Sequence, residues 1–140
     1  MASRSSQKQR EHDNVLAGIV RLRWRGSEGR VYSNPDGEKN CAVNYRDRAG
    51  RVQQVYPDIV VLETTTNTVR CVGEVETPET VTEAESPQWR DYAKIGGECY
   101  LYVPSGTEQR AKQLLSRAAG IRLRRYYFGP GGLLNIENLN

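Results

Sequence analysis

Two apolar segments joined by a short polar turn constrain the fold of this chain more than any other feature. Residues 58–63 (DIVVLE) are apolar without interruption between their two acids, which is typical of a strand covered on both faces. The polar run TTTNT follows, and residues 69–77 (VRCVGEVET) are predicted to return as the partner strand. Because a tight turn joins them, the two strands are expected to pair antiparallel.

The other segments predict helices on the faces of that sheet. Apolar residues at helical spacing predict a first helix over residues 6–25. Ser86 followed by Pro87 predicts the start of another helix and Gly96-Gly97 its end, so this helix is expected over residues 86–95. The other expected elements are a turn (31–40), a hairpin (41–46 and 51–56), a strand (99–104), a helix (108–120), a strand (121–128) and a C-terminal tail (129–140). We therefore expect an α/β protein, a single domain over residues 1–140 with an αβββαβ core, a mixed central sheet flanked by helices and a frayed start at residues 1–8.

The cysteines and the single histidine limit the chemistry. Cys41, Cys71 and Cys99 form no CxxC pair, and an odd number favours free thiols in a reducing compartment. His12 is the only histidine, so neither a zinc site nor a serine–histidine pair is indicated, and chemistry is expected from carboxylates. No apolar run approaches the roughly 18 residues that cross a bilayer, and no secretory signal is visible. We expect a cytoplasmic protein with no membrane partner.

Three acids are predicted to meet at one end of the strand pair. Glu74 and Glu76 are two residues apart on a strand and so project from the same face. Asp58 begins the neighbouring strand, which places it beside them if the two strands are antiparallel. Acids at strand ends often simply face solvent, but two acids within an apolar strand need a partner. Oxygen ligands without histidine or thiolate suit Mg²⁺ or Mn²⁺.

These residues resemble the motif of the PD-(D/E)XK nuclease superfamily. Pro57 and Asp58 are similar to its PD, and Glu74-Val75-Glu76 is similar to its (D/E)-x-K, with glutamate where lysine is usual. Residues 88–92 (QWRDY) look like the Q-x-x-x-Y element of RecB-type members. Gln88 and Tyr92 are four residues apart, so on a helix they lie on the same face. The expected order of elements over roughly residues 15–128 agrees with the core of the family. The resemblance implies a restriction-endonuclease-like fold.

The resemblance also implies roles for individual residues. Asp58, Glu74 and the backbone carbonyl of Val75 would hold Mg²⁺ or Mn²⁺, and a water activated there would attack phosphorus. Glu76 would accept a proton from that water or bind a second ion. Gln88 would orient the water or a phosphate, and Tyr92 would contact the nucleic-acid backbone. Many members add an acid from the first helix, and the candidates for that role are Glu11 and then Asp13.

The expected partner is nucleic acid, with DNA preferred to RNA. The basic residues proposed to contact its phosphates are Arg90, Arg21, Arg23, Arg25, Arg122 and Arg124, with Arg125 beside them. Each of these arginines also fits an ordinary solvated face. The alternative function is a catalytically weak or inactive module of the same fold that binds nucleic acid or a protein partner. Small domains of this fold often dimerise, so a homodimer is a further expected assembly.

Overall fold

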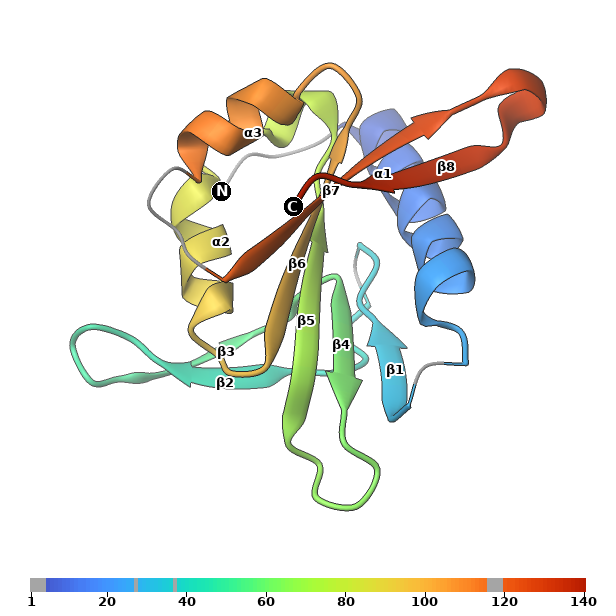
Figure 1. Cartoon of the computed structure of the whole chain (residues 1–140). Coiled ribbons are helices and arrows are strands. Elements are labelled where there is room, and N and C mark those ends of the chain that lie inside the picture. The colour runs from blue at the N-terminus through green and yellow to red at the C-terminus, as the bar shows by residue number, and fades with distance from the viewer. Residues whose placement is uncertain (1–4, 27, 37, 116–119) are drawn as a thin grey trace.

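A six-stranded mixed sheet forms the centre of the computed structural model, which describes residues 5–26, 28–36, 38–115 and 120–140. The strand order is β1-β4-β5-β6-β7-β8, with α1 on one face and α2 and α3 on the other (Figure 1). The strands of this sheet are β1 (Arg30–Ser33), β4 (Ile59–Leu62), β5 (Val69–Val75), β6 (Glu98–Pro104), β7 (Ile121–Phe128) and β8 (Leu134–Asn138). The helices are α1 (Ser6–Ile19), α2 (Ser86–Ala93) and α3 (Glu108–Leu114). Single helical turns lie at η2 (Pro78–Thr80) and η3 (Pro130–Gly132).

The pairing of the central strands agrees with the sequence prediction. β4 and β5 are antiparallel, with Ile59 opposite Gly73 and Val60 opposite Val72. The crossovers through α2 and α3 make β5, β6 and β7 parallel neighbours. The α/β class and the mixed sheet are therefore confirmed.

Each face of the sheet carries its own buried cluster. On the α1 face, Val15, Leu16 and Ile19 pack against β4, β5 and β6 residues that include Ile59 and Val75. On the other face, α2, α3 and the hairpin of β2 (Val43–Arg46) and β3 (Val52–Val55) cover the alternate side chains of the same strands, Val60, Val72, Leu101 and Val103 among them. Residues of β4 are buried on both sides, which explains the uninterrupted apolar run that the sequence showed.

Both edge strands differ from the sequence expectation. Residues 31–40 were expected to be a turn, but Arg30–Ser33 pair with β4 as β1, so the first three residues of that range belong to a strand. Residues 129–140 were expected to be a tail, but Leu134–Asn138 pair antiparallel with β7 as β8. Such short segments obtain their order from the strand that they pair with rather than from their own propensity.

The hairpin and the ends of the helices also differ in detail from the sequence prediction. β2 (Val43–Arg46) and β3 (Val52–Val55) form the predicted hairpin, but as a separate two-stranded sheet. The first helix is α-helical only to Ile19 and continues as a π-helical segment, η1 (Val20–Trp24). It begins at Ser6, where the Ser5 hydroxyl accepts the N–H of Lys8 at 3.3 Å, so residues 6–8 are helical rather than frayed. Residues 1–4, and residues 116–119 of the predicted third helix, lie outside the described part of the chain.

The start of α2 is shifted by one residue from the prediction. Glu85, not Ser86, occupies the cap position, and the Ser86 hydroxyl donates to the carbonyl of Glu83 at 3.0 Å. Among the described residues, no helix is long and apolar enough to span a bilayer.

Candidate active site

Asp58 and Glu74 lie together at one end of the β4–β5 pair. The Asp58 N–H donates to Oε1 of Glu74 at 2.8 Å, and the Val75 N–H donates to Oδ2 of Asp58 at 2.8 Å. Strand pairing stops at Ile59 and Gly73, so beyond this point the side chains replace the backbone as partners between the two segments. Of the three acids that were predicted to meet here, the structure brings Asp58 and Glu74 into contact in this way.

His12 joins this pair, and sequence reasoning missed it. Its side chain projects from α1 with only 2% of the residue exposed, and Nε2 lies 3.0 Å from Oδ2 of Asp58. On the other side of the ring, Nδ1 lies 2.9 Å from Oδ1 of Asp13, which also accepts a hydrogen bond from Gln9 at 3.0 Å. Asp13 thereby fixes the ring so that Nε2 faces Asp58.

The two acids of the first helix that were suggested as metal ligands contact other residues of that helix. Glu11 is exposed and lies 3.6 Å from Lys8, while its neighbour His12 takes the position facing Asp58. One residue on a helix is a rotation of about 100°, which is enough to move a side chain from the buried face to solvent. Asp13, the second candidate, supports His12 instead of joining Asp58 and Glu74.

Glu76 shares a face of β5 with Glu74 but lies in the interior. It is 1% exposed, its Oε1 accepts the indole N–H of Trp89 at 3.1 Å, and its backbone carbonyl accepts the hydroxyl of Tyr126 at 2.7 Å. Burial raises the pKa of Glu76 to about 7, against hydrogen bonds from Thr80 and Trp89 that lower it. The Glu76 carboxyl therefore links the end of β5 to α2 in the interior and is not presented to solvent beside Glu74.

Gln88 and Tyr92 lie side by side on α2, as their spacing predicted. The Gln88 side-chain amide donates to the Tyr92 hydroxyl at 2.9 Å. Burial raises the pKa of Tyr92 strongly, and the nearby carboxylates of Glu74 and Asp58 raise it further. Tyr92 is therefore a neutral phenol close to both acids.

The donor types at this place suit a divalent cation, although its ligand shell is not formed in this conformation. An imidazole and two carboxylates are ligands that Mn²⁺ accepts, and Mg²⁺ prefers the carboxylates alone. Asp58 and Glu74 each direct one carboxylate oxygen to a backbone N–H. Within residues 5–26, 28–36, 38–115 and 120–140, no three histidine, cysteine or acidic side chains are already arranged around a common point.

Most arginines that the sequence suggested for phosphate binding hold the fold together. Arg124 is 6% exposed and bonds to Asn140, and the Arg90 guanidinium donates to the carbonyl of Leu114 at 2.9 Å. The other contacts are Arg122 with Glu98 at 2.8 Å, Arg125 with Glu108 at 2.9 Å and with Glu137, and Arg23 with the carbonyl of Ile136 at 2.8 Å. Arg21 and Arg25 are exposed but lie about 13–20 Å beyond His12 along the first helix.

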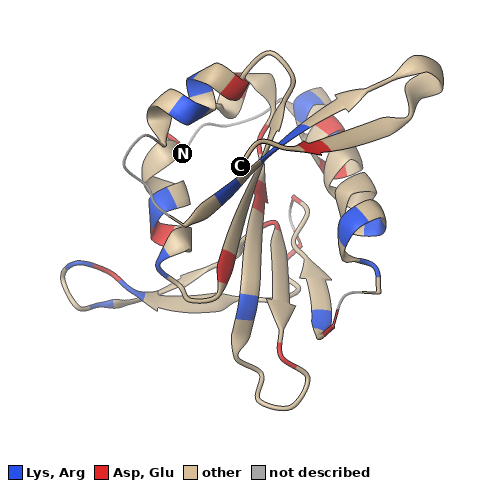
Figure 2. Ribbon diagram, viewed as in Figure 1, with Lys and Arg blue, Asp and Glu red and all other residues tan. Residues whose placement is uncertain are grey.

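A group of arginines that sequence reasoning did not single out is better exposed. Arg46, Arg48 and Arg51 surround the turn of the β2–β3 hairpin, which extends away from the sheet (Figure 2). The Tyr45 hydroxyl ties the hairpin to α2 through Asp91 at 3.3 Å. The RDRAGR run was visible in the sequence, where alternation of one acid among arginines is the signal.

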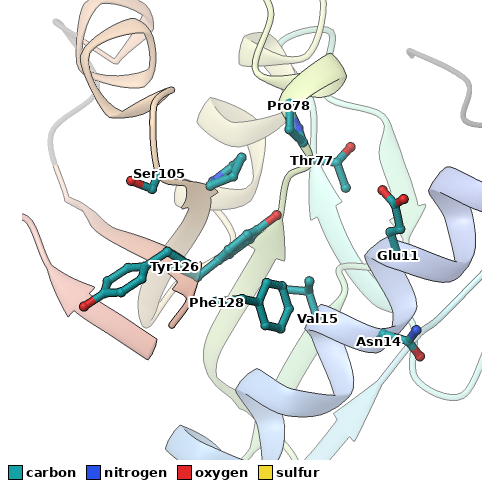
Figure 3. Close-up of a pocket in the computed structure, with 10 residues that line it drawn as sticks. Glu11, Asn14, Val15, Thr77, Pro78, Ser105, Tyr126 and Phe128 are labelled. Carbon is teal, nitrogen blue, oxygen red and sulfur yellow. The ribbon is translucent and has the colours of Figure 1, made fainter. Parts of the chain in front are cut away.

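A cavity of about 370 Å³ opens between α1 and the start of the β7–β8 hairpin (Figure 3). Glu11 projects into it from α1, and the Phe128 ring lies beside Val15. Thr77, directly after Glu76, forms the wall nearest the acids. The remaining lining residues are Asn14, Pro78, Pro104, Ser105, Tyr126 and Tyr127.

The three free cysteines take no part in this site: Cys71 and Cys99 are buried in the two cores, and Cys41 is half-buried.

No protein-family model matches the sequence, and no curated protein matches it at a significant level.

Proposed function

We propose that this chain is a metal-dependent nuclease with a restriction-endonuclease-like fold that hydrolyses phosphodiester bonds, with DNA as the expected substrate. The observation that carries the proposal is the pair of contacts that join His12 to Asp58 and Asp58 to Glu74, from three separate segments, at one end of the sheet. A buried histidine against a buried carboxylate, with a second carboxylate one hydrogen bond away, is an expensive arrangement for a purely structural site.

The residues that would hold the ion are His12 through Nε2, Asp58, Glu74 and the carbonyl of Val75. A divalent ion bound there would lower the pKa of a coordinated water and neutralise charge on a phosphoryl oxygen. Because one donor is an imidazole, we expect Mn²⁺ to support activity better than Mg²⁺.

The protein's own groups supply orientation. Asp13 holds the imidazole of His12 in place, as carboxylates behind ligating histidines commonly do. The neutral hydroxyl of Tyr92, close to Asp58 and Glu74, and the amide of Gln88 beside that hydroxyl are hydrogen-bond donors suited to phosphate oxygens. Glu76 does not stand in for the lysine of the family, since its carboxyl bonds to Trp89 in the interior.

A cleavage assay with matched variants tests the proposal. Labelled single-stranded and double-stranded DNA and RNA are incubated with the protein in Mn²⁺, Mg²⁺ or EDTA. We expect cleavage in Mn²⁺ that EDTA abolishes, and a loss of about 100-fold or more in rate for Asp58→Asn, Glu74→Gln and His12→Ala. Glu63→Gln, a carboxylate change at the opposite end of β4, is the control and should cleave like the wild type. Intact substrates in every condition, with no Mn²⁺ binding by calorimetry, would exclude the nuclease.

The second candidate is a non-catalytic binding module of the same fold. What favours it is the interior position of Glu76 where the family has lysine, together with exposed Phe128 and Leu133 on the β7–β8 hairpin. In that case Asp58→Asn would leave nucleic-acid or partner binding intact, and no metal would produce cleavage.

A further inference from the structure

The cavity between α1 and β7 is lined by chain neighbours of the candidate active site, because Glu11 precedes His12 on α1 and Thr77 follows Glu76. Its wall at Thr77 begins one residue beyond Glu76, and the floor residue Tyr126 bonds through its hydroxyl to the Glu76 carbonyl at 2.7 Å. Thr77 is three residues along the chain from Glu74, or about 10 Å in extended backbone, which is close to the length of three stacked nucleotides. A strand whose phosphate lay at Asp58 and Glu74 would therefore bring a nearby base to this cavity.

The walls of the cavity suit a flat aromatic ring. Phe128 is 58% exposed at the end of β7, and its ring lies beside Val15 (Figure 3). Pro78 and Pro104 add rigid apolar surface on the other sides. The volume, about 370 Å³, falls in the range of small-molecule sites, roughly 300–1,000 Å³. Exposed aromatic rings beside a nucleic-acid path are where unpaired bases stack.

The polar groups of the cavity are placed for the edge of a base. Glu11 projects from α1 toward Thr77 (Figure 3), and Asn14 and Ser105 complete the polar lining. A carboxylate accepts hydrogen bonds only, so it matches the exocyclic amino group of cytosine, adenine or guanine and repels the carbonyl edge of thymine or uracil.

We infer that this cavity binds one unpaired nucleobase of a single-stranded nucleic acid, stacked on Phe128 with its amino group bonded to Glu11. The choice of a nucleobase as the occupant rests on the proposed nuclease function. The inference gives Glu11 a role in substrate choice, not the metal-binding role that the sequence suggested for it.

Equilibrium binding in EDTA tests this without depending on catalysis. Fluorescence anisotropy is measured with short labelled homopolymers of deoxycytidine, deoxyadenosine and deoxythymidine, their RNA counterparts, and a blunt duplex. We expect amino-bearing single strands to bind more tightly than deoxythymidine strands and the duplex. Phe128→Ala should weaken single-strand binding by about 5- to 100-fold, the usual effect of losing one stacked base, and Phe128→Trp should retain it. Leu133→Ala, at a 71% exposed apolar residue of the same hairpin outside the cavity, is the matched control and should bind like the wild type.

Glu11→Ala tests the contact to the base edge. Removing a negative charge raises affinity for every polyanion, so the measured quantity is the ratio of affinities for deoxycytidine and deoxythymidine strands, in which that common effect cancels. We expect the ratio to fall to near one. Wild-type binding by Phe128→Ala, or an equal loss for Leu133→Ala, would overturn the inference. Single-strand binding that needs Phe128 without any cleavage in Mn²⁺ would refute the nuclease and retain the base site. Cleavage that needs Asp58 but not Phe128 would support the nuclease and refute the base site.

Discussion

Glu76 is a carboxyl group whose protonation is tied to folding. Because burial raises its pKa to about 7 from an ordinary value near 4.5, the native state binds this proton more tightly than the unfolded chain does. The stability that this proton supplies is complete below pH 4.5 and is lost as the pH rises through 7. At higher pH the native state holds a negative charge on Glu76 in the interior, where the hydrogen bond from the Trp89 indole is one of its contacts.

The neutral variant Glu76→Gln isolates that effect. Glutamine keeps an oxygen acceptor for the Trp89 indole N–H and carries no charge at any pH. We expect Glu76→Gln to be more stable than the wild type by about 1–3 kcal/mol at pH 8 in EDTA, and the advantage to disappear at pH 4.5. Urea unfolding at the two pH values measures it. A difference that does not change between them would mean that the Glu76 carboxyl is already charged in the native state at low pH.

At the scale of elements, the sequence predicted what repeats regularly and missed what depends on pairing. The strand period placed Glu74 and the start of β4 correctly at one end of the sheet. His12 stands three residues before Val15 and four before Leu16, on the helical face that those apolar residues define, so the same periodicity could have found it. β1 and β8 could not be found this way, because their four- and five-residue segments are ordered by β4 and β7.

The β2–β3 hairpin is an element whose arginines we expect to contact phosphates. Asp47 orders the turn by accepting the N–H groups of Ala49 and Arg51, each at 2.9 Å, so the turn holds the arginines on a fixed backbone. The double variant Arg48→Ala, Arg51→Ala should weaken nucleic-acid binding about equally for all sequences and reduce the slope of log affinity against log salt by about two. Anisotropy titrations at several NaCl concentrations measure both quantities.

The control for the hairpin is Arg70→Ala, which removes an exposed arginine from the opposite end of β5, where it pairs with Glu28 at 3.4 Å. It should leave the salt slope nearly unchanged. Equal losses from the hairpin and control variants would indicate a general effect of net charge, and the hairpin would have no specific role.

At the scale of the whole molecule, the C-terminal residues connect the sheet edge to the site. The Asn140 side chain accepts the Leu123 N–H at 2.8 Å and donates to the Ile121 carbonyl at 3.0 Å, and it also accepts from the buried guanidinium of Arg124 at 3.2 Å. These bonds hold β7, the strand whose Tyr126 reaches Glu76 and whose Phe128 lines the cavity.

Asn140→Ala should therefore weaken both the fold and the base site. It leaves the buried Arg124 guanidinium with fewer acceptors and removes two bonds to the β7 backbone, so we expect a loss of about 1–3 kcal/mol in the free energy of unfolding. Asn138→Ala, at an exposed β8 residue, is the matched control and should change stability little, which urea unfolding of both variants will show. If β7 transmits the change to Phe128, single-strand affinity falls for Asn140→Ala at temperatures where the variant is still fully folded. Unchanged affinity under those conditions would mean that α1, η2 and the end of β6 fix the cavity, since they carry its remaining walls at Glu11, Pro78 and Pro104.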